Sequence, residues 1–160
     1  MAISLRPFEH TDMDAVVALS LRAWAPVFVS IEEVLGAELF EFFYKGDWRR
    51  SQEADVRAAC AEHTTLVADD DERVVGFTVV SIPEEGNEGE IYMLAVDPDA
   101  QQGGLGSRLT EAGVDLIRTA GKEVAVVGTG SDPGHAPARA TYEKAGFTAW
   151  PSHRYYRLLD

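Results

Sequence analysis

Cysteine is nearly absent from this sequence: its 160 residues contain one, Cys60. No internal disulfide can form, which is the usual situation in a reducing compartment. The chain also lacks any stretch that approaches the roughly 18 consecutive apolar residues of a membrane span. Its first ten residues, MAISLRPFEH, lack the charged start and apolar run of a signal peptide. These absences predict a soluble protein of the cytoplasm with no membrane partner.

Basic residues are scarce: 14 stand against 27 acidic ones, and the formal net charge is −13. This balance argues against a nucleic-acid partner, because such binding depends on neutralised phosphates. It is compatible with a cationic small molecule, although an acidic surface often serves solubility alone. No spacing of His, Cys and Asp suggests a metal site. Hydrophobic residues make up 46% of the chain, which predicts one domain with a packed core over residues 1–160.

Apolar periodicity predicts a mixture of strands and helices in one α/β or α+β sheet domain. Thr11 is a plausible N-cap for the first helix, Pro26 is expected to end or kink it, and Ser30 is a plausible cap for the next. The predicted strands are 3–8, 64–69, 73–82, 90–96, 123–129, 147–150 and 153–159. After the first helix, the predicted helices are 30–44, 47–62, 103–120 and 138–146.

Three glycines in four positions, GGLG at 103–106, stand where a predicted strand leads into a predicted helix. A helix N-terminus presents unpaired backbone N–H groups and a partial positive charge, and bare glycines let an anion approach them. A Rossmann site needs GxGxxG early in the chain with an acid about 20 residues later, and a P-loop needs GxxxxGK[ST]. Neither pattern is present. A phosphate cradle and a tight turn without ligand remain open from the glycines alone.

The surroundings of the glycines are similar to a known family. The stretch LAVDPDAQQGGLGSRL resembles the acetyl-CoA signature of the GNAT acyltransferase superfamily, and HAPARATYEKAGF (135–147) resembles its second conserved element. The resemblance covers residues 64–150 well. It implies the GNAT fold, which is a mixed, mostly antiparallel twisted sheet of six to seven strands flanked by helices and splayed between the fourth and fifth strands.

The resemblance also implies where acetyl-CoA would bind. The pantetheine arm would lie along the strand backbone at Leu94, Ala95 and Val96, and an amide near Leu94 would polarise the thioester carbonyl. The pyrophosphate would meet the N–H groups of the glycine turn. The remaining cofactor-binding candidates are Gln101, Gln102, Gly103, Gly104, Leu105, Gly106, Ser107 and His135. His135 departs from the family, which commonly has Asn there, so that cofactor contact, helix capping and proton transfer stay open for it.

Two residues are candidates for catalysis. Tyr142 matches the family tyrosine that acts as general acid toward the leaving thiolate, with a packed core tyrosine as the alternative. Glu90 begins the strand EIYMLAV, where some members carry their general base, although a solvated carboxylate at a strand end fits as well. Gly130 occupies another position that members use for a base, and it cannot act. The aromatic residues of 24–48 either belong to the core or shape the acceptor pocket.

The predicted function is acetyl-CoA-dependent acyl transfer, with N-acetylation of a primary amine by direct attack as the first reading. Acetyl-CoA is the expected cosubstrate, without a metal, and the acceptor is a small-molecule or protein amine. An acyl-CoA sensor without turnover is the alternative from another class, and an interaction domain that has lost CoA is a third. The aromatic C-terminal stretch HRYYRLL leaves a homodimer open, through pairing at a sheet edge.

Overall fold

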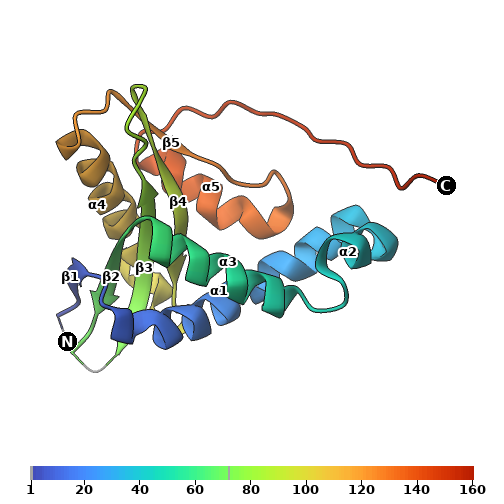
Figure 1. The fold of residues 1–160 in the computed structure, drawn as a ribbon, viewed down its shortest axis with the longest axis horizontal. Helices are drawn as coiled ribbons and strands as arrows, with labels where there is room; N and C mark the ends of the chain where they lie inside the picture. The colour runs from blue at the N-terminus through green and yellow to red at the C-terminus, as the bar shows by residue number, and fades with distance from the viewer. Residues whose placement is uncertain (1, 72) are drawn as a thin grey trace.

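One five-stranded sheet organises the protein in this computed structural model, which describes residues 2–71 and 73–160 (Figure 1). The strands follow the order β1-β2-β3-β4-β5. The first four are antiparallel to their neighbours and β5 is parallel to β4. The predicted mixed, mostly antiparallel sheet is therefore confirmed, with five strands rather than six to seven. The strand bounds are β1 (Ser4–Pro7), β2 (Thr64–Asp69), β3 (Val74–Ser81), β4 (Glu88–Val96) and β5 (Val124–Val127).

The sheet opens between β4 and β5, as the resemblance implied. The two strands pair from Glu88 opposite Val124 to Ile91 opposite Val127, and β5 ends there. The second half of β4 continues to Val96 while still paired with β3 on its other side. A bulge sets Tyr92 between the paired residues Ile91 and Met93 and twists the strand at the same point. This leaves one backbone edge of residues 92–96 without a strand neighbour among the residues described.

Helices cover both faces of the sheet (Figure 1). On one face α1 contacts β3 and β4, with α3 packed against α1, and on the other α4 contacts β3 and β4. Phe77 lies fully buried in the core on the α1 side, and Leu109 lies fully buried on the α4 side. The helices are α1 (Met13–Leu35), α2 (Ala37–Tyr44), α3 (Trp48–Glu62), α4 (Leu105–Thr119) and α5 (Ala136–Lys144), with 3-10 turns η1 (His10–Asp12), η2 (Pro98–Gly103) and η3 (Pro133–His135).

The N-terminal helix differs from its prediction. Pro26 does not end α1, which continues to Leu35 and stops at Gly36, whose φ of 81° is a left-handed value. The predicted helix over 30–44 is therefore wrong: its first part belongs to α1 and its second part is α2. Ser30 is a buried residue inside α1, not a cap, and Thr11 lies within η1. A proline costs a helix interior about 3 kcal/mol, and burial of α1 against the sheet and α3 outweighs that cost.

The segment His10–Leu35 also corrects the expectation about apolar stretches. It is long and apolar enough to cross a membrane by length and composition, with a mean hydropathy of 1.5 over its most apolar window. The same test is passed by core helices of soluble proteins. The contacts of α1 with α3, β3 and β4 are those of a helix packed on a sheet.

The last predicted strands are absent. Residues 147–160 have no regular structure, and Figure 1 shows this red segment leaving α5 and running away from the sheet. Trp150 is 92% exposed and Tyr155 is 91% exposed, while the Tyr156 ring contacts the Phe43 ring of α2 edge-on at 4.9 Å. A strand needs a hydrogen-bonded partner along its length, and no strand of the described chain pairs with these residues. The aromatic and apolar composition of HRYYRLL was therefore not sufficient to predict a strand.

An ion pair with a buried carboxylate joins α1 to the turn after β4. The Asp97 carboxylate, which is 2% exposed, accepts from both terminal nitrogens of Arg22 at 2.9 and 3.0 Å. Its Oδ1 also accepts from the Asp99 N–H at 2.9 Å, and Arg73 approaches its Oδ2 at 3.4 Å. Asp97 thereby fixes the course of the chain from β4 into η2. The Arg22 side chain is 48% exposed, so that loss of Asp97 would remove the hydrogen bonds of its carboxylate and would leave a cation that water still reaches.

Replacement of Asp97 with alanine is expected to lower the free energy of unfolding by about 2 kcal/mol, because Arg22 and the Asp99 N–H lose their charged acceptor. Asp115 offers a matched control, since it pairs with Arg118 on the surface and is 66% exposed. Asp115→Ala should change stability by less than about 0.5 kcal/mol. Urea denaturation of both variants measures the two effects. Equal stability losses would show that the Asp97 pair does not anchor the turn.

Candidate active site

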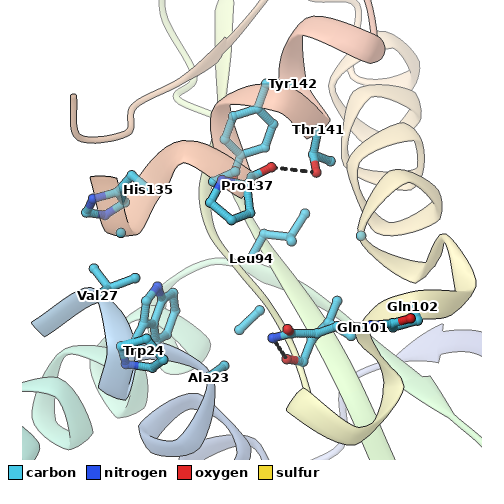
Figure 2. Close-up of a pocket in the computed structure, with 16 residues that line it drawn as sticks. Ala23, Trp24, Val27, Leu94, Gln101, Gln102, His135, Pro137, Thr141 and Tyr142 are labelled. Carbon is cyan, nitrogen blue, oxygen red and sulfur yellow. Dashed lines mark hydrogen bonds between the residues drawn. The ribbon is translucent and has the colours of Figure 1, made fainter. Parts of the chain in front are cut away.

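A cavity of about 600 Å³ opens where β4 separates from β5. Residues of α1 form one wall, the end of β4 forms the floor, and η2, α4, η3 and α5 complete the cavity (Figure 2). Six elements of the chain thus line one pocket beside the open edge of β4. The predicted residues that it brings together are Leu94, Ala95, Val96, Gln101, Gln102, Gly106, His135 and Tyr142.

The glycine turn leaves the start of α4 bare. Gly104 is the N-cap residue with a φ of 72°, a left-handed conformation that glycine adopts at little cost, and no side chain caps the helix. A Cβ on Gly103 or Gly104 would meet nothing within 4 Å. Crowding therefore does not explain these glycines. The open space lies over the unpaired N–H groups of the first turn, as an anion site requires.

Gly106 faces the cavity. A Cβ there would stand 3.9 Å from Thr141 and 4.0 Å from Val96, which is ordinary van der Waals contact. The fold therefore has room for a side chain at this position, but that side chain would occupy part of the cavity. Leu105 is 1% exposed and packs in the core, and only its backbone N–H is available to a ligand. Gly103, Gly104, Leu105 and Ser107 adjoin the lining without belonging to it.

The open edge of β4 forms the cavity floor at Leu94, Ala95 and Val96. Gln101 holds the following turn against this strand, because its Nε2 donates to the Val96 carbonyl at 3.2 Å. An extended chain that lies along the edge would find backbone donors and acceptors, as an added strand does. The floor and the bare helix start together fit a ligand with an amide-bearing arm and a phosphate group, as acetyl-CoA has.

Tyr142 lines the cavity from α5, beside Pro137 in Figure 2. Its ring packs edge-on against Phe147, with the ring centroids 6.1 Å apart. Burial raises the pKa of the Tyr142 hydroxyl above its ordinary value. The phenol consequently stays protonated at neutral pH and is chemically a proton donor.

His135 stands at the start of α5, where Figure 2 shows its ring facing Val27 and Trp24 of α1. Its Nδ1 is hydrogen-bonded to Asp132 Oδ1, and Ser30 Oγ donates to Asp132 Oδ2 at 2.6 Å. Burial alone would raise the pKa of the Asp132 carboxyl, but the hydrogen bonds from Ser30 and His135 hold it below its usual value. Asp132 is therefore an ionised partner for the imidazole.

Glu90 lies outside the cavity lining. It pairs with Ser81 of β3 and Val126 of β5, four residues before Leu94 along β4, which is roughly 13 Å at strand spacing. These contacts do not test the prediction that Glu90 is the general base, which stays a prediction. Sequence reasoning also missed part of the site, because it took Ser30 for a helix cap and did not connect it with Asp132.

The wall from α1 consists of Ala23, Trp24, Pro26 and Val27. Trp24 also packs edge-on against Phe77 of the core at 6.2 Å, so that it serves core and cavity together. Over residues 2–71 and 73–160, no group of three or more His, Cys, Asp or Glu side chains is placed to hold a metal ion.

Comparisons with known proteins agree with this geometry. The model of the acetyltransferase (GNAT) family matches residues 31–147, which is most of the chain. The chain belongs to the GNAT acetyltransferase family. A mycothiol acetyltransferase from Actinosynnema mirum is 32% identical over 159 residues, which cover 98% of this chain and 48% of that protein. The chain thus spans about half the length of the curated relative it matches.

Solved GNAT structures share the fold. PaiA N-acetyltransferase from Thermoplasma acidophilum, in complex with coenzyme A, has a TM-score of 0.72 at 16% identity, covering 96% of this chain and 94% of that one. Aminoglycoside N-acetyltransferase AAC(6')-Iy, in complex with CoA, has a TM-score of 0.68 at 17% identity, covering 98% and 95%. At these identities the likeness establishes the GNAT fold of the present chain.

A glutamate in place of Gly106 is expected to weaken CoA binding in the cavity without unfolding the protein. The backbone there is helical and a Cβ fits, while a carboxylate would repel phosphate at the helix N-terminus. Titration calorimetry with CoA should show affinity weakened by more than about tenfold. Thr119→Glu, at the exposed other end of α4, is the control. Unchanged CoA affinity in the Gly106 variant would place the phosphates elsewhere.

Proposed function

We propose that this protein is an acetyl-CoA-dependent N-acetyltransferase that acts on a primary amine. The observation that carries the proposal is the single cavity formed by the open edge of β4, the uncapped start of α4 and Tyr142 of α5. Membership of the GNAT family and the CoA-bound structural neighbours support it. The cytoplasm is the proposed location, with which the free, buried thiol of Cys60 is compatible.

Different residues of the cavity would bind acetyl-CoA, stabilise the developing charge and supply a proton. When bound, acetyl-CoA supplies the activated thioester. The N–H groups from Gln102 to Ser107 would hold its phosphates, and the backbone at Leu94, Ala95 and Val96 would hold its arm. A β4 amide near Leu94 would stabilise the oxygen that gains charge during attack. Tyr142, protonated at neutral pH, would give a proton to the departing thiolate.

The proposed acceptor is a primary amine of small-molecule size. The net charge of −13 favours a cationic acceptor over an anionic one. Relatives are named for mycothiol and for aminoglycosides, which are small molecules, while a further structural neighbour is named for a ribosomal-protein alanine. A screen should therefore contain aminoglycosides, the non-acetylated form of mycothiol and a peptide with an N-terminal alanine.

We propose that the protein forms a homodimer through its exposed C-terminal tail. Trp150, Tyr155 and Leu159 are at least 85% exposed, and β5 is an edge strand with Val124 and Val126 partly exposed. A second copy of the chain would cover both apolar groups. Light scattering should give twice the monomer mass for the full chain, and a variant with all three tail residues changed to serine should be monomeric. A monomeric full chain contradicts this.

Tyr142→Phe is expected to lower kcat by about 10²-fold while CoA affinity stays within twofold, because the ring remains and only the proton donor is lost. Release of the CoA thiol, followed with a thiol-reactive dye, measures kcat, and calorimetry measures affinity. Tyr155→Phe, on the exposed tail, is the matched control.

Two outcomes of this assay go against the proposal. Full activity in Tyr142→Phe would remove the tyrosine from the proton transfer. CoA binding without transfer to any amine by the unmutated protein would instead favour an acyl-CoA sensor.

A further inference from the structure

The loop between β5 and α5 is built around one pair of side chains, Asp132 and His135. A Cβ on Gly130 would stand 2.6 Å from His135 Nδ1 and closer still to Asp132 Oδ1. Real Cβ atoms do not approach other atoms so closely, so that residue 130 has to be glycine for the pair to form. The space beside the backbone of residue 130 is thus filled by the hydrogen bond between the imidazole and the carboxylate.

A second glycine clears the other side of Asp132. Ser30 Oγ donates to Asp132 Oδ2 at 2.6 Å and accepts from the Gly134 N–H at 2.9 Å. A Cβ on Gly134 would stand 2.7 Å from Ser30 Cβ. Ser30 is 6% exposed and comes from α1, about a hundred residues away in the chain. A long-range contact therefore fixes this carboxylate.

Arg139 closes the loop from α5. Its Nη1 donates to the Gly130 carbonyl at 2.6 Å and to the Asp132 carbonyl at 2.8 Å. Five residues thus cooperate to hold one imidazole. Asp132 caps η3 by accepting from the Gly134 N–H at 3.1 Å, but this cap does not require the imidazole, and His135 makes no side-chain capping bond to α5. Rigid support of a functional group is what proton transfer requires.

The imidazole is turned toward the cavity. With Nδ1 bonded to Asp132, its Nε2 is free of any partner among the residues described, and His135 belongs to the lining. Val27 and Trp24 stand opposite (Figure 2). Tyr142 lies two helical turns further along α5, about 10 Å, and helical side chains lean toward the N-terminus. His135 and Tyr142 therefore lie along one side of the cavity.

We propose that His135 is the general base of the reaction and that Asp132 and Ser30 are its positioning residues. This rests on the proposed amine acetylation. Nε2 takes a proton from the acceptor ammonium, directly or through one water, and the freed nitrogen attacks the thioester carbonyl. The C–N bond forms and the C–S bond breaks. Tyr142 protonates the thiolate, and the second nitrogen proton replaces the one that Tyr142 gives. Imidazolium then loses its proton to solvent.

The ionised Asp132 stabilises the imidazolium as it forms and holds the Nδ1–H tautomer, which leaves Nε2 as acceptor. The charged groups that face the pair are few: Asp132 from the loop and the Arg139 guanidinium from α5. From α1 the neighbours are Ser30, Val27 and Trp24, none of which titrates near neutral pH.

His135→Asn tests the proposal. Asparagine keeps a polar side chain of similar reach but cannot take a proton, so that kcat should fall about 10²-fold at pH 7 while CoA affinity stays within threefold. At pH values near the pKa of the acceptor amine, activity should recover, because the amine then arrives deprotonated. Asp132→Asn should lower kcat with intact CoA affinity, and Ser30→Ala should do so more weakly. His10→Asn, on the exposed turn η1, is the control.

Each other outcome overturns the proposal. Full kcat with weakened CoA affinity in His135→Asn would make His135 a cofactor contact. A loss of kcat that is the same at all pH values would make its role structural. A 10²-fold loss in Glu90→Gln alongside an active His135→Asn would assign the base to Glu90. If the unmutated protein acetylates no amine, the proposed function fails first, and the result is distinct from a failure of His135 alone.

Discussion

The separation of β4 from β5 after Ile91 is the constraint on which the rest of the site depends. A paired strand satisfies its backbone, whereas β4 carries an edge of unpaired donors and acceptors into the interior beyond this point. The short β5 produces the gap, and the bulge at Tyr92 increases the twist that widens it. A ligand with an amide-bearing arm can then complete the sheet where the chain itself does not.

Three contacts around the gap between β4 and β5 hold the walls of the cavity in place. The Arg22–Asp97 pair joins α1 to the end of β4, so that the α1 wall and the floor keep their spacing. Gly104 turns the chain from η2 into α4 with its first N–H groups uncapped. Ser30 extends from α1 to Asp132 and holds the start of α5 on the opposite side. Three connections of different kinds, an ion pair, a turn and a hydrogen bond, thus define one cavity.

The sequence predicted the parts of the fold that depend on local pattern. The central strands and the helix after the glycines follow from periodicity and from the turn. The placement of Tyr142 and Gly106 at one cavity was implied by the resemblance of two motifs to the GNAT family. Pro26 inside α1 was not predictable, because burial against distant strands decides it. The same holds for Ser30, whose partner Asp132 is 102 residues away. The tail over 147–160 was wrongly predicted as strands, because aromatic and apolar residues form a strand only where a partner strand exists.

Hydrogen exchange would show directly whether acetyl-CoA binds along the open edge of β4. Backbone amides would be followed in the free protein and in saturating acetyl-CoA. Two separate segments should become protected together: the open edge of β4 at 92–96 and the turn with the start of α4 at 102–107. Protection of α4 alone would leave the open edge of β4 without a role. Binding that protects neither segment would contradict the account.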